Sequence, residues 1–216
     1  MKRIIVNSLL IMVFSLTACS NDTQSYSKGI YLLLDTSGTY TRELEKANEI
    51  IKYFLSQLEA GDTFAVARID SGSFSEKDII AKATFDARPS VSNNQKREFS
   101  RTVESFIKTV KSSAYTDISG GMLQGIEYLD ESMSGKKTIF IFSDLKEELP
   151  KGYVRDVRFD LNGYRVVAIN ATKLRSDNIN PAEYMDRLSH WQNLVQSSGG
   201  EWSVINDLDR EDALML

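Results

Sequence analysis

The feature of this chain that most constrains its fold is a run of five apolar residues that ends at an aspartate and is followed by an amphipathic helix. Residues 30–34 are all apolar, as expected for a central strand that is covered on both faces, and Asp35 ends the run. Over residues 41–58, apolar side chains recur at steps of three and four, which predicts a helix with one buried face that ends before Gly61. A buried strand followed by such a helix requires a sheet on which helices pack.

The same alternation continues along the chain. Further strands are predicted at 63–69, 79–85, 138–142, 164–169 and 202–205, and further helices after Pro89, after Thr116-Asp117, and over 181–196 with Asn180 as the capping residue. The connection between the second and third strands is too short for a crossover helix, so these strands are expected to be antiparallel neighbours. Residues 147–162 fit both a hairpin and a helix face, and both interpretations stay open. The chain is therefore predicted to be an α/β domain with a largely parallel central sheet, flanked by helices, and one antiparallel edge strand.

Composition removes several classes of function. The 216 residues include one Cys and one His, so an internal disulfide, a Cys-rich zinc site and a His cluster are excluded. The formal charge of −4 offers no basic footprint for nucleic acid, and no nucleic-acid partner is expected. His190 is expected at the surface or in a hydrogen bond, and Trp191 and Trp202 in the core or an interface.

The N-terminal residues have the pattern of an export signal. Lys2 and Arg3 precede a mostly apolar stretch at 4–14, which is too short to span a bilayer as a helix. Leu16-Thr17-Ala18-Cys19 resembles the bacterial lipobox, in which the peptidase cleaves before a Cys that carries a diacylglyceryl group. Ser20, rather than Asp, follows the Cys, and in enterobacterial lipoproteins this pattern is associated with export to the outer membrane. The alternative is an ordinary signal peptide with a chance Cys.

These patterns divide the chain into three parts. We expect a lipoprotein signal peptide at 1–18, a lipidated Cys19 with a polar tether at 19–28, and a folded domain at 29–216. The expected location is the bacterial cell envelope, on the periplasmic side of the outer membrane rather than on the inner membrane. Acyl chains anchor a protein without a transmembrane helix, so membrane contact is expected through the lipid alone.

Hydroxyl and carboxylate side chains gather at three predicted loops. Asp35-Thr36-Ser37-Gly38-Thr39 follows the first strand, Thr116 precedes a helix, and Asp144 ends a later strand. Ligands of α/β sheets bind at the carboxyl ends of the strands, where Asp35 and Asp144 fall. Together these residues resemble the von Willebrand factor type A domain family, whose metal-ion-dependent adhesion site combines D-x-S-x-S with a Thr in a second loop and an Asp in a third. The resemblance covers about residues 29–207.

The resemblance implies a Rossmann-like fold and a divalent metal site. Ser37, Thr39 and Thr116 would supply hydroxyl ligands, and Asp35 and Asp144 would bind directly or through water. Mg²⁺ or Mn²⁺ is the expected ion, because hard cations prefer oxygen ligands and Mg²⁺ keeps several waters. A vacant coordination position would then accept an Asp or Glu of a partner protein.

Three residues at or beside this site need separate comment. Thr39 stands at the third position of the motif, where it keeps a hydroxyl but adds a methyl group. Leu145 follows Asp144, where many members of the family have Gly. Asp117, beside Thr116, is expected to support the ligands from behind rather than to bind the metal itself.

Other interpretations of the same residues stay open. Asp35, Thr36 and Ser37 also suit a helix cap and a turn. The strings at 35–39 and 70–73 look like aspartic protease motifs, but an all-β protease has no place for the helix between them. The first string also resembles the D-x-D-G-T of haloacid-dehalogenase phosphatases, with Asp35 as the nucleophile and Ser37 in place of the acid.

The sequence thus predicts a lipid-anchored envelope protein whose domain binds a protein partner through a metal and is not an enzyme. A Mg²⁺-dependent phosphoryl hydrolase that uses Asp35 and a metal-free scaffold are the alternatives, and fold analogy alone names no partner. Glu147 and Glu148 are expected to be a solvated acidic pair.

Overall fold

A computed structural model of the chain describes residues 27–38, 40–70, 74–155, 157–208 and 214. The predicted signal peptide at 1–18 and Cys19 lie outside the described residues, as does most of the tether. In chain order the strands and α-helices are β1 (Lys28–Asp35), α2 (Leu44–Gln57), β2 (Thr63–Ile69), β3 (Ile79–Thr84), α3 (Pro89–Thr109), α4 (Ile118–Glu131), β4 (Lys136–Phe142), β5 (Tyr164–Ile169), α5 (Pro181–Ser197) and β6 (Glu201–Ile205).

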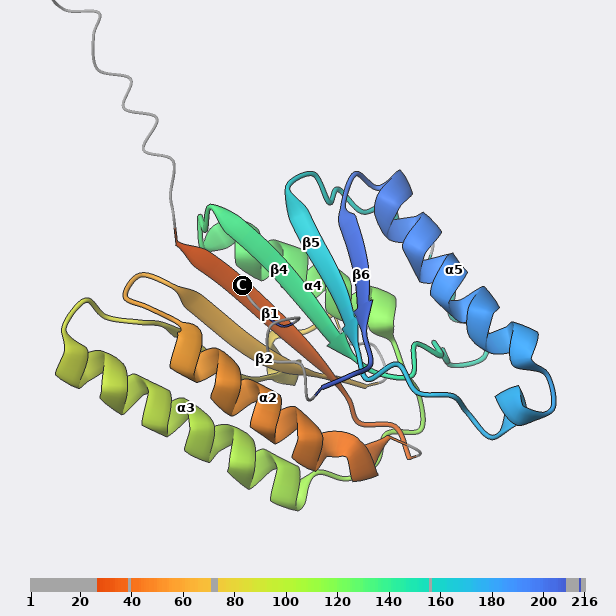
Figure 1. Cartoon of the computed structure of the whole chain (residues 1–216), viewed down its shortest axis with the longest axis horizontal. Helices are drawn as coiled ribbons and strands as arrows, with labels where there is room; N and C mark the ends of the chain where they lie inside the picture. The colour runs from red at the N-terminus through yellow and green to blue at the C-terminus, as the bar shows by residue number, and fades with distance from the viewer. Residues whose placement is uncertain (1–26, 39, 71–73, 156, 209–213, 215–216) are drawn as a thin grey trace, which may run out of the picture.

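The strands form one six-stranded sheet in the order β3-β2-β1-β4-β5-β6 (Figure 1). β2 and β3 are antiparallel, and every other neighbouring pair is parallel. This confirms the predicted α/β class and the antiparallel edge strand. The short connection after β2 has no room for a helix, whereas each parallel pair requires a crossover.

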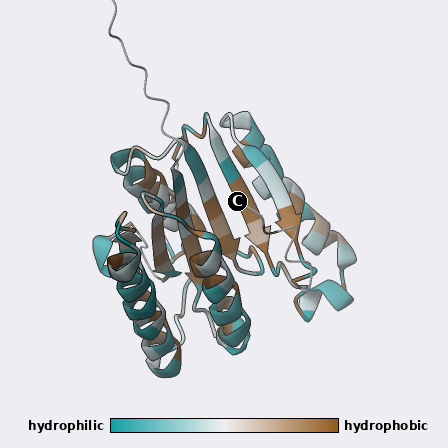
Figure 2. Cartoon of the chain, turned by 60° about the vertical axis from the view of Figure 1, so that its left-hand side comes forward, coloured by the Kyte–Doolittle hydropathy of each residue, from teal (hydrophilic) through white to brown (hydrophobic). Residues whose placement is uncertain are grey.

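Helices cover both faces of the sheet, which explains why the central strands are apolar throughout. Alternate residues of β1 enter two separate cores: Ile30 packs with α2 and α3, whereas Tyr31 packs with α4 and α5. Figure 2 shows the hydrophobic colour concentrated on the strands and the hydrophilic colour on the outward sides of the helices. No helix in the described part of the chain is long and apolar enough to cross a membrane.

Three local predictions differ from the structure. The helix predicted from residue 41 begins as a short 3-10 helix at Thr41–Glu43, and α2 starts at Leu44. Asn180 precedes α5, but its side chain makes no capping hydrogen bond to the backbone and instead donates to Glu183 at 3.2 Å. The described residues of 147–162 form neither the hairpin nor the helix that their sequence fits. They pair with the rest of the chain through an antiparallel bridge between Glu148 and Thr116.

Two glycines let α4 lie close to β1. A Cβ atom on Gly121 would lie 2.7 Å from a methyl carbon of Leu33, and one on Gly125 would lie 2.8 Å from a ring carbon of Tyr31. Both partner side chains are fully buried, so neither has free space to move into. This close packing fixes the start of α4, which carries the Thr116 loop, against the central strand.

We predict that Gly125→Ala destabilises the domain although Ala favours helices. Overpacking against Tyr31 costs about 1–3 kcal/mol, which exceeds the helix preference of about 1 kcal/mol. Urea unfolding measures the free energy, and Glu127→Ala on the exposed side of α4 is the matched control. A variant as stable as the parent protein would show that α4 can move away from the sheet at little cost.

Candidate metal site

The carboxylate of Asp35 lies buried at the carboxyl end of β1. Its two oxygens accept hydrogen bonds from the backbone N–H of Ser37 at 2.8 Å and from the hydroxyl of Ser143 at 2.6 Å. The side chain is 1% exposed, and this burial raises the pKa of Asp35, whereas the hydrogen bonds from Ser143 and Ser37 oppose the rise. Ser143 therefore ties the end of β4 to the end of β1.

Asp144 follows Ser143 at the end of β4 and is also buried. One of its carboxylate oxygens accepts the backbone N–H of Lys146 at 2.9 Å. Burial raises the pKa of Asp144 to about 6, with a smaller contribution from the charge of Asp35. The charge of Asp35 therefore acts on Asp144 across the ends of β1 and β4.

Leu145 has the backbone conformation that a glycine favours. Its φ of 65° lies in the left-handed region, which disfavours residues that have a Cβ. Its N–H donates to the hydroxyl of Ser143 at 3.0 Å, and its carbonyl accepts the indole N–H of Trp191 at 3.0 Å. The side chain is itself buried, so hydrogen bonds and packing together hold the turn without glycine.

The hydroxyl-bearing loops are joined by backbone hydrogen bonds. The carbonyl of Thr36 accepts the N–H of Ser113 at 2.8 Å, and Thr116 exchanges two hydrogen bonds with Glu148 at 2.8 and 2.9 Å. The hydroxyl of Thr36 donates to the carbonyl of Ile69 at 2.8 Å. The loops after β1, before α4 and after β4 are thus held in one cluster.

Ser37, Thr116 and Asp144 line one pocket of about 230 Å³. Asp35 does not line this pocket, but its carboxylate accepts the N–H of Ser37, which does. The pocket lies where the chain order of the sheet reverses, because β2 and β4 flank β1 on opposite sides. Three of the five predicted ligands thus line one pocket, Asp35 is hydrogen-bonded to one of them, and Thr39 lies outside the described residues.

The structure does not support the interpretation of residues 35–37 as a helix cap. α2 begins at Leu44, and no side chain caps it or the short 3-10 helix before it. Asp35 does bind the N–H of Ser37, so the turn interpretation holds for that one hydrogen bond. Neither interpretation accounts for the hydroxyl of Ser143, which donates to Asp35; its position just before Asp144 is the sequence signal for this contact.

Asp117 is the N-cap residue of α4 and is fully buried. Its carboxylate accepts the N–H of Gly120 at 2.8 Å and forms an ion pair with Arg155 at 2.5 Å. Asp117 therefore fixes the start of α4, just after Thr116, and its support of the metal ligands stays a prediction. Arg155 belongs to residues 147–162, whose sequence fits both a hairpin and a helix face.

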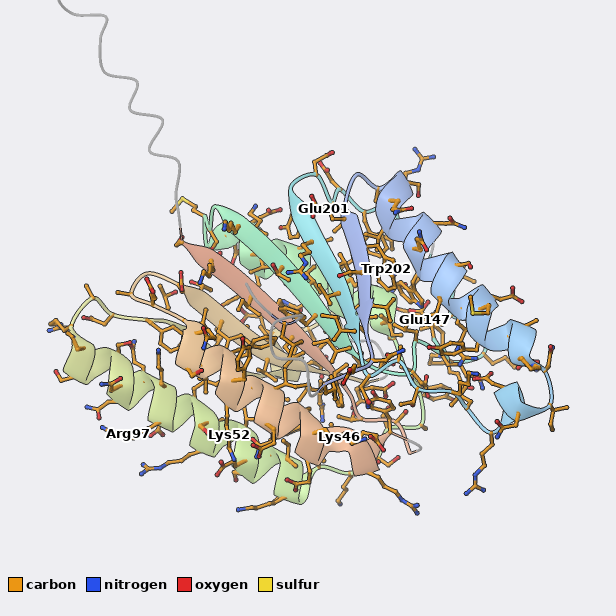
Figure 3. All side chains as sticks on the ribbon, viewed as in Figure 1. Lys46, Lys52, Arg97, Glu147, Glu201 and Trp202 are labelled. Atoms are coloured by element: carbon orange, nitrogen blue, oxygen red, sulfur yellow. The ribbon has the colours of Figure 1, made fainter. Side chains whose placement is uncertain are left out.

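Glu147 and Glu148 are not a solvated pair, which corrects the prediction. Glu147 accepts the N–H of Ser119 at 2.7 Å and its hydroxyl at 3.2 Å, so it satisfies a free donor in the first turn of α4. Glu148 is exposed, pairs with Lys146 at 2.5 Å and lines the pocket. Figure 3 shows Glu147 near the carboxyl ends of the strands.

The donor atoms at the pocket are all oxygens. No group of three or more His, Cys, Asp or Glu side chains arranged to hold a metal occurs within the described ranges. Neither Asp35 nor Asp144 makes an ion pair with any described residue, so their buried charges have no direct cationic partner. Hydroxyls, carboxylates and water suit Mg²⁺ or Mn²⁺, and such an ion would offset both charges.

Comparison with known proteins supports the fold. No model of a protein family matches the chain, and no curated protein matches it in sequence. A von Willebrand factor type A protein from Catenulispora acidiphila matches 87% of this chain with 16% identity and a TM-score of 0.53. The open form of the pilus adhesin SpaC from Lactobacillus rhamnosus GG matches 85% of it with 13% identity and a TM-score of 0.51. The chain spans 41% and 28% of those two proteins, respectively. The predicted von Willebrand factor type A fold is confirmed.

The raised pKa of Asp144 predicts a pH dependence of stability. Between its ordinary value of 3.8 and about 6, the folded chain binds a proton more tightly than the unfolded chain, so this group lowers stability as the pH rises through that window. Asp144→Asn should therefore raise the free energy of unfolding at pH 7 by about 3 kcal/mol and change it little at pH 4.

Urea unfolding in EDTA at the two pH values measures this difference. Asp207→Asn, on an exposed residue outside the pocket, is the control. An equal effect of Asp144→Asn at pH 4 and pH 7 would contradict the prediction.

We also predict that Arg155→Ala destabilises the domain strongly. The substitution leaves the charge of Asp117, which is fully buried, without its cationic partner, at a cost of about 3–5 kcal/mol. Combining it with Asp117→Asn should restore much of the loss, because the double variant no longer buries a lone charge. A loss below about 0.5 kcal/mol in chemical unfolding would show that the pair contributes little.

Proposed function

We propose that this chain is a lipid-anchored envelope protein whose von Willebrand factor type A fold binds a partner protein through a divalent cation. The observation that supports the proposal is the pocket that Ser37, Thr116 and Asp144 line together, with the buried carboxylate of Asp35 bound to the N–H of Ser37. The likeness to solved structures supports the fold, and the metal and the partner are our inference from the donor atoms.

The residues of the pocket have separate roles in this proposal. Ser37 and Thr116 offer hydroxyl oxygens, and Asp144 offers the carboxylate oxygen that does not accept the N–H of Lys146. Asp35 is buried and does not line the pocket, so it acts through its charge or through water. Thr39 is the remaining hydroxyl of the motif. The bound ion would supply a positive charge and an open position for a carboxylate of the partner.

No observation favours the phosphatase alternative. A nucleophilic aspartate must present a free oxygen to the phosphorus atom of its substrate. Asp35 is 1% exposed and does not line the pocket, so a substrate in the pocket cannot reach it. Its environment suits a fixed charge better than a nucleophile.

Thermal unfolding tests the metal. Mg²⁺ or Mn²⁺ in about 100-fold excess over its Kd should stabilise the purified chain by about 2.7 kcal/mol, which raises the Tm by about 5 °C or more relative to EDTA. Thr116→Val and Asp144→Asn should abolish most of that rise, whereas Asp207→Asn should leave it intact. No rise at millimolar metal would favour the metal-free scaffold.

The lipid anchor is tested independently of the metal. We expect the mature chain to begin at a diacylated Cys19 and to sediment with membranes after alkaline washing. Cys19→Ala should remove the lipid mass and release the protein from the membrane fraction. Mass spectrometry of the N-terminal peptide provides the readout, and an unmodified Cys19 in the parent protein would rule out the anchor.

A further inference from the structure

A second pocket adjoins the candidate metal site. It measures about 500 Å³ and shares Gly38, Asp144, Lys146 and Leu174 with the metal pocket. Its other walls come from the segment after β1 and the segment after β5; these lining residues are Tyr40, Arg42, Glu43, Thr172, Lys173, Arg175 and Ser176. The two pockets therefore share a wall, and we call the second pocket the basic groove.

The basic groove is cationic although the chain carries a net charge of −4. Arg42, Lys146, Lys173 and Arg175 line it, against the carboxylates of Glu43 and Asp144. Glu43 is already paired with Lys46, which lies outside the groove, at 2.6 Å, and Lys146 is paired with Glu148 at 2.5 Å, which leaves Arg42, Lys173 and Arg175 against Asp144. The cations thus outnumber the carboxylates that remain to balance them, and the excess favours an anionic ligand.

Two of these cations are available to a ligand. Arg42 and Arg175 are exposed, and neither makes an ion pair with a described residue. A guanidinium group binds a carboxylate through two parallel hydrogen bonds, which a lysine cannot do. These two side chains approach the groove from different segments, Arg42 from the 3-10 helix before α2 and Arg175 from the loop after β5.

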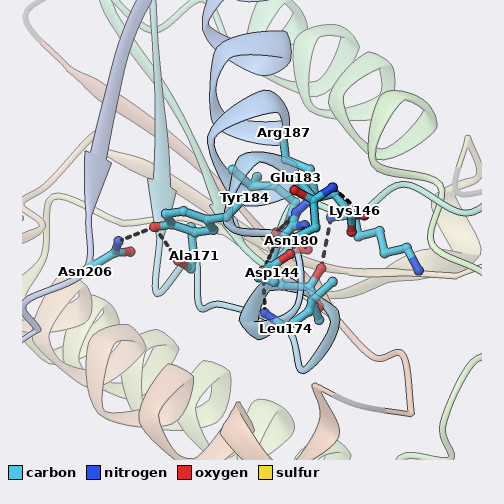
Figure 4. Close-up of polar contacts among 12 residues, drawn as sticks. Asp144, Lys146, Ala171, Leu174, Asn180, Glu183, Tyr184, Arg187 and Asn206 are labelled. Carbon is cyan, nitrogen blue, oxygen red and sulfur yellow. Dashed lines mark hydrogen bonds and ion pairs between the residues drawn. The ribbon is translucent and has the colours of Figure 1, made fainter.

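The wall that carries Lys173 and Arg175 is held in place. The carboxylate of Asp177 accepts two hydrogen bonds from Arg187 at 2.9 and 2.8 Å and one from the N–H of Leu174 at 2.6 Å. The same guanidinium donates to the backbone carbonyl of Asp144 at 3.3 Å. Figure 4 shows Arg187 beside both Asp144 and the turn at Leu174. Arg187 therefore fixes the wall of the basic groove relative to the metal pocket.

We infer that the partner presents an acidic segment of several Asp or Glu residues, which occupies the metal pocket and the basic groove together. The inference rests on the proposed function and extends it. One carboxylate binds the cation at Asp144, and the following carboxylates bind Arg42 and Arg175. The fixed wall means that little loop ordering opposes binding.

Fluorescence anisotropy with labelled hexaglutamate tests this inference on the purified full-length chain. We expect binding in millimolar Mn²⁺ that EDTA weakens, that high salt weakens, and that hexaglutamine does not reproduce. The double variant Arg42→Glu/Arg175→Glu should lower the affinity for hexaglutamate about tenfold or more. The matched control, Arg97→Glu/Arg101→Glu, changes the same charge on α3, which lines neither pocket, and should bind as the parent protein does (Figure 3).

The outcomes separate this inference from the proposed function. The thermal shift with Mn²⁺ reports the metal site alone and should persist in Arg42→Glu/Arg175→Glu. A retained shift without hexaglutamate binding, or with binding that the double variant does not weaken, overturns the acidic segment and leaves the metal site standing. Equal binding in Mn²⁺ and EDTA overturns the joint occupation of the two pockets. Absence of the thermal shift in the parent protein overturns the proposed function itself.

Discussion

The hydrogen bond from the hydroxyl of Ser143 to the carboxylate of Asp35 joins the carboxyl ends of β4 and β1, the two central strands of the sheet. It is buried, and it holds a carboxylate where burial disfavours the charge. The other oxygen of Asp35 orients the backbone at Ser37. The positions of the ends of β1 and β4, which carry the proposed ligands, therefore depend on this contact. The shape of the pocket depends on it for the same reason.

The order of the strands explains why the pocket lies at this place. The chain passes from β1 to β2 on one side, and β4 adds to the other side of β1, so the segments that follow β1 and β4 run apart and leave a crevice. The backbone contacts of Ser113 with Thr36 and of Glu148 with Thr116 then bring the remaining loops to the edge of that crevice. The fold thus supplies a polar site that no single loop could form.

Buried charges serve two different purposes around the pocket. Asp117 and Asp177 have their charges matched by Arg155 and Arg187, and these pairs fix loops. Asp35 and Asp144 have no such partner within the described residues. Arg187 donates to the backbone carbonyl of Asp144 but not to its carboxylate. Paired charges stabilise the surroundings, and the unpaired ones make the pocket receptive to a cation.

The sequence by itself determined the fold class, the strand ends and the position of Asp35 and Asp144 at them, because continuous apolar runs report burial on both faces of a sheet. It did not determine residues 147–162, which have no regular pattern and are held by the ion pair to Asp117 and the contacts of Glu147 with α4. Nor did it indicate the basic groove, whose arginines, Arg42 and Arg175, lie on segments far apart in the chain. Periodicity describes one element at a time, whereas the crossovers of the tertiary structure alone decide which loops meet.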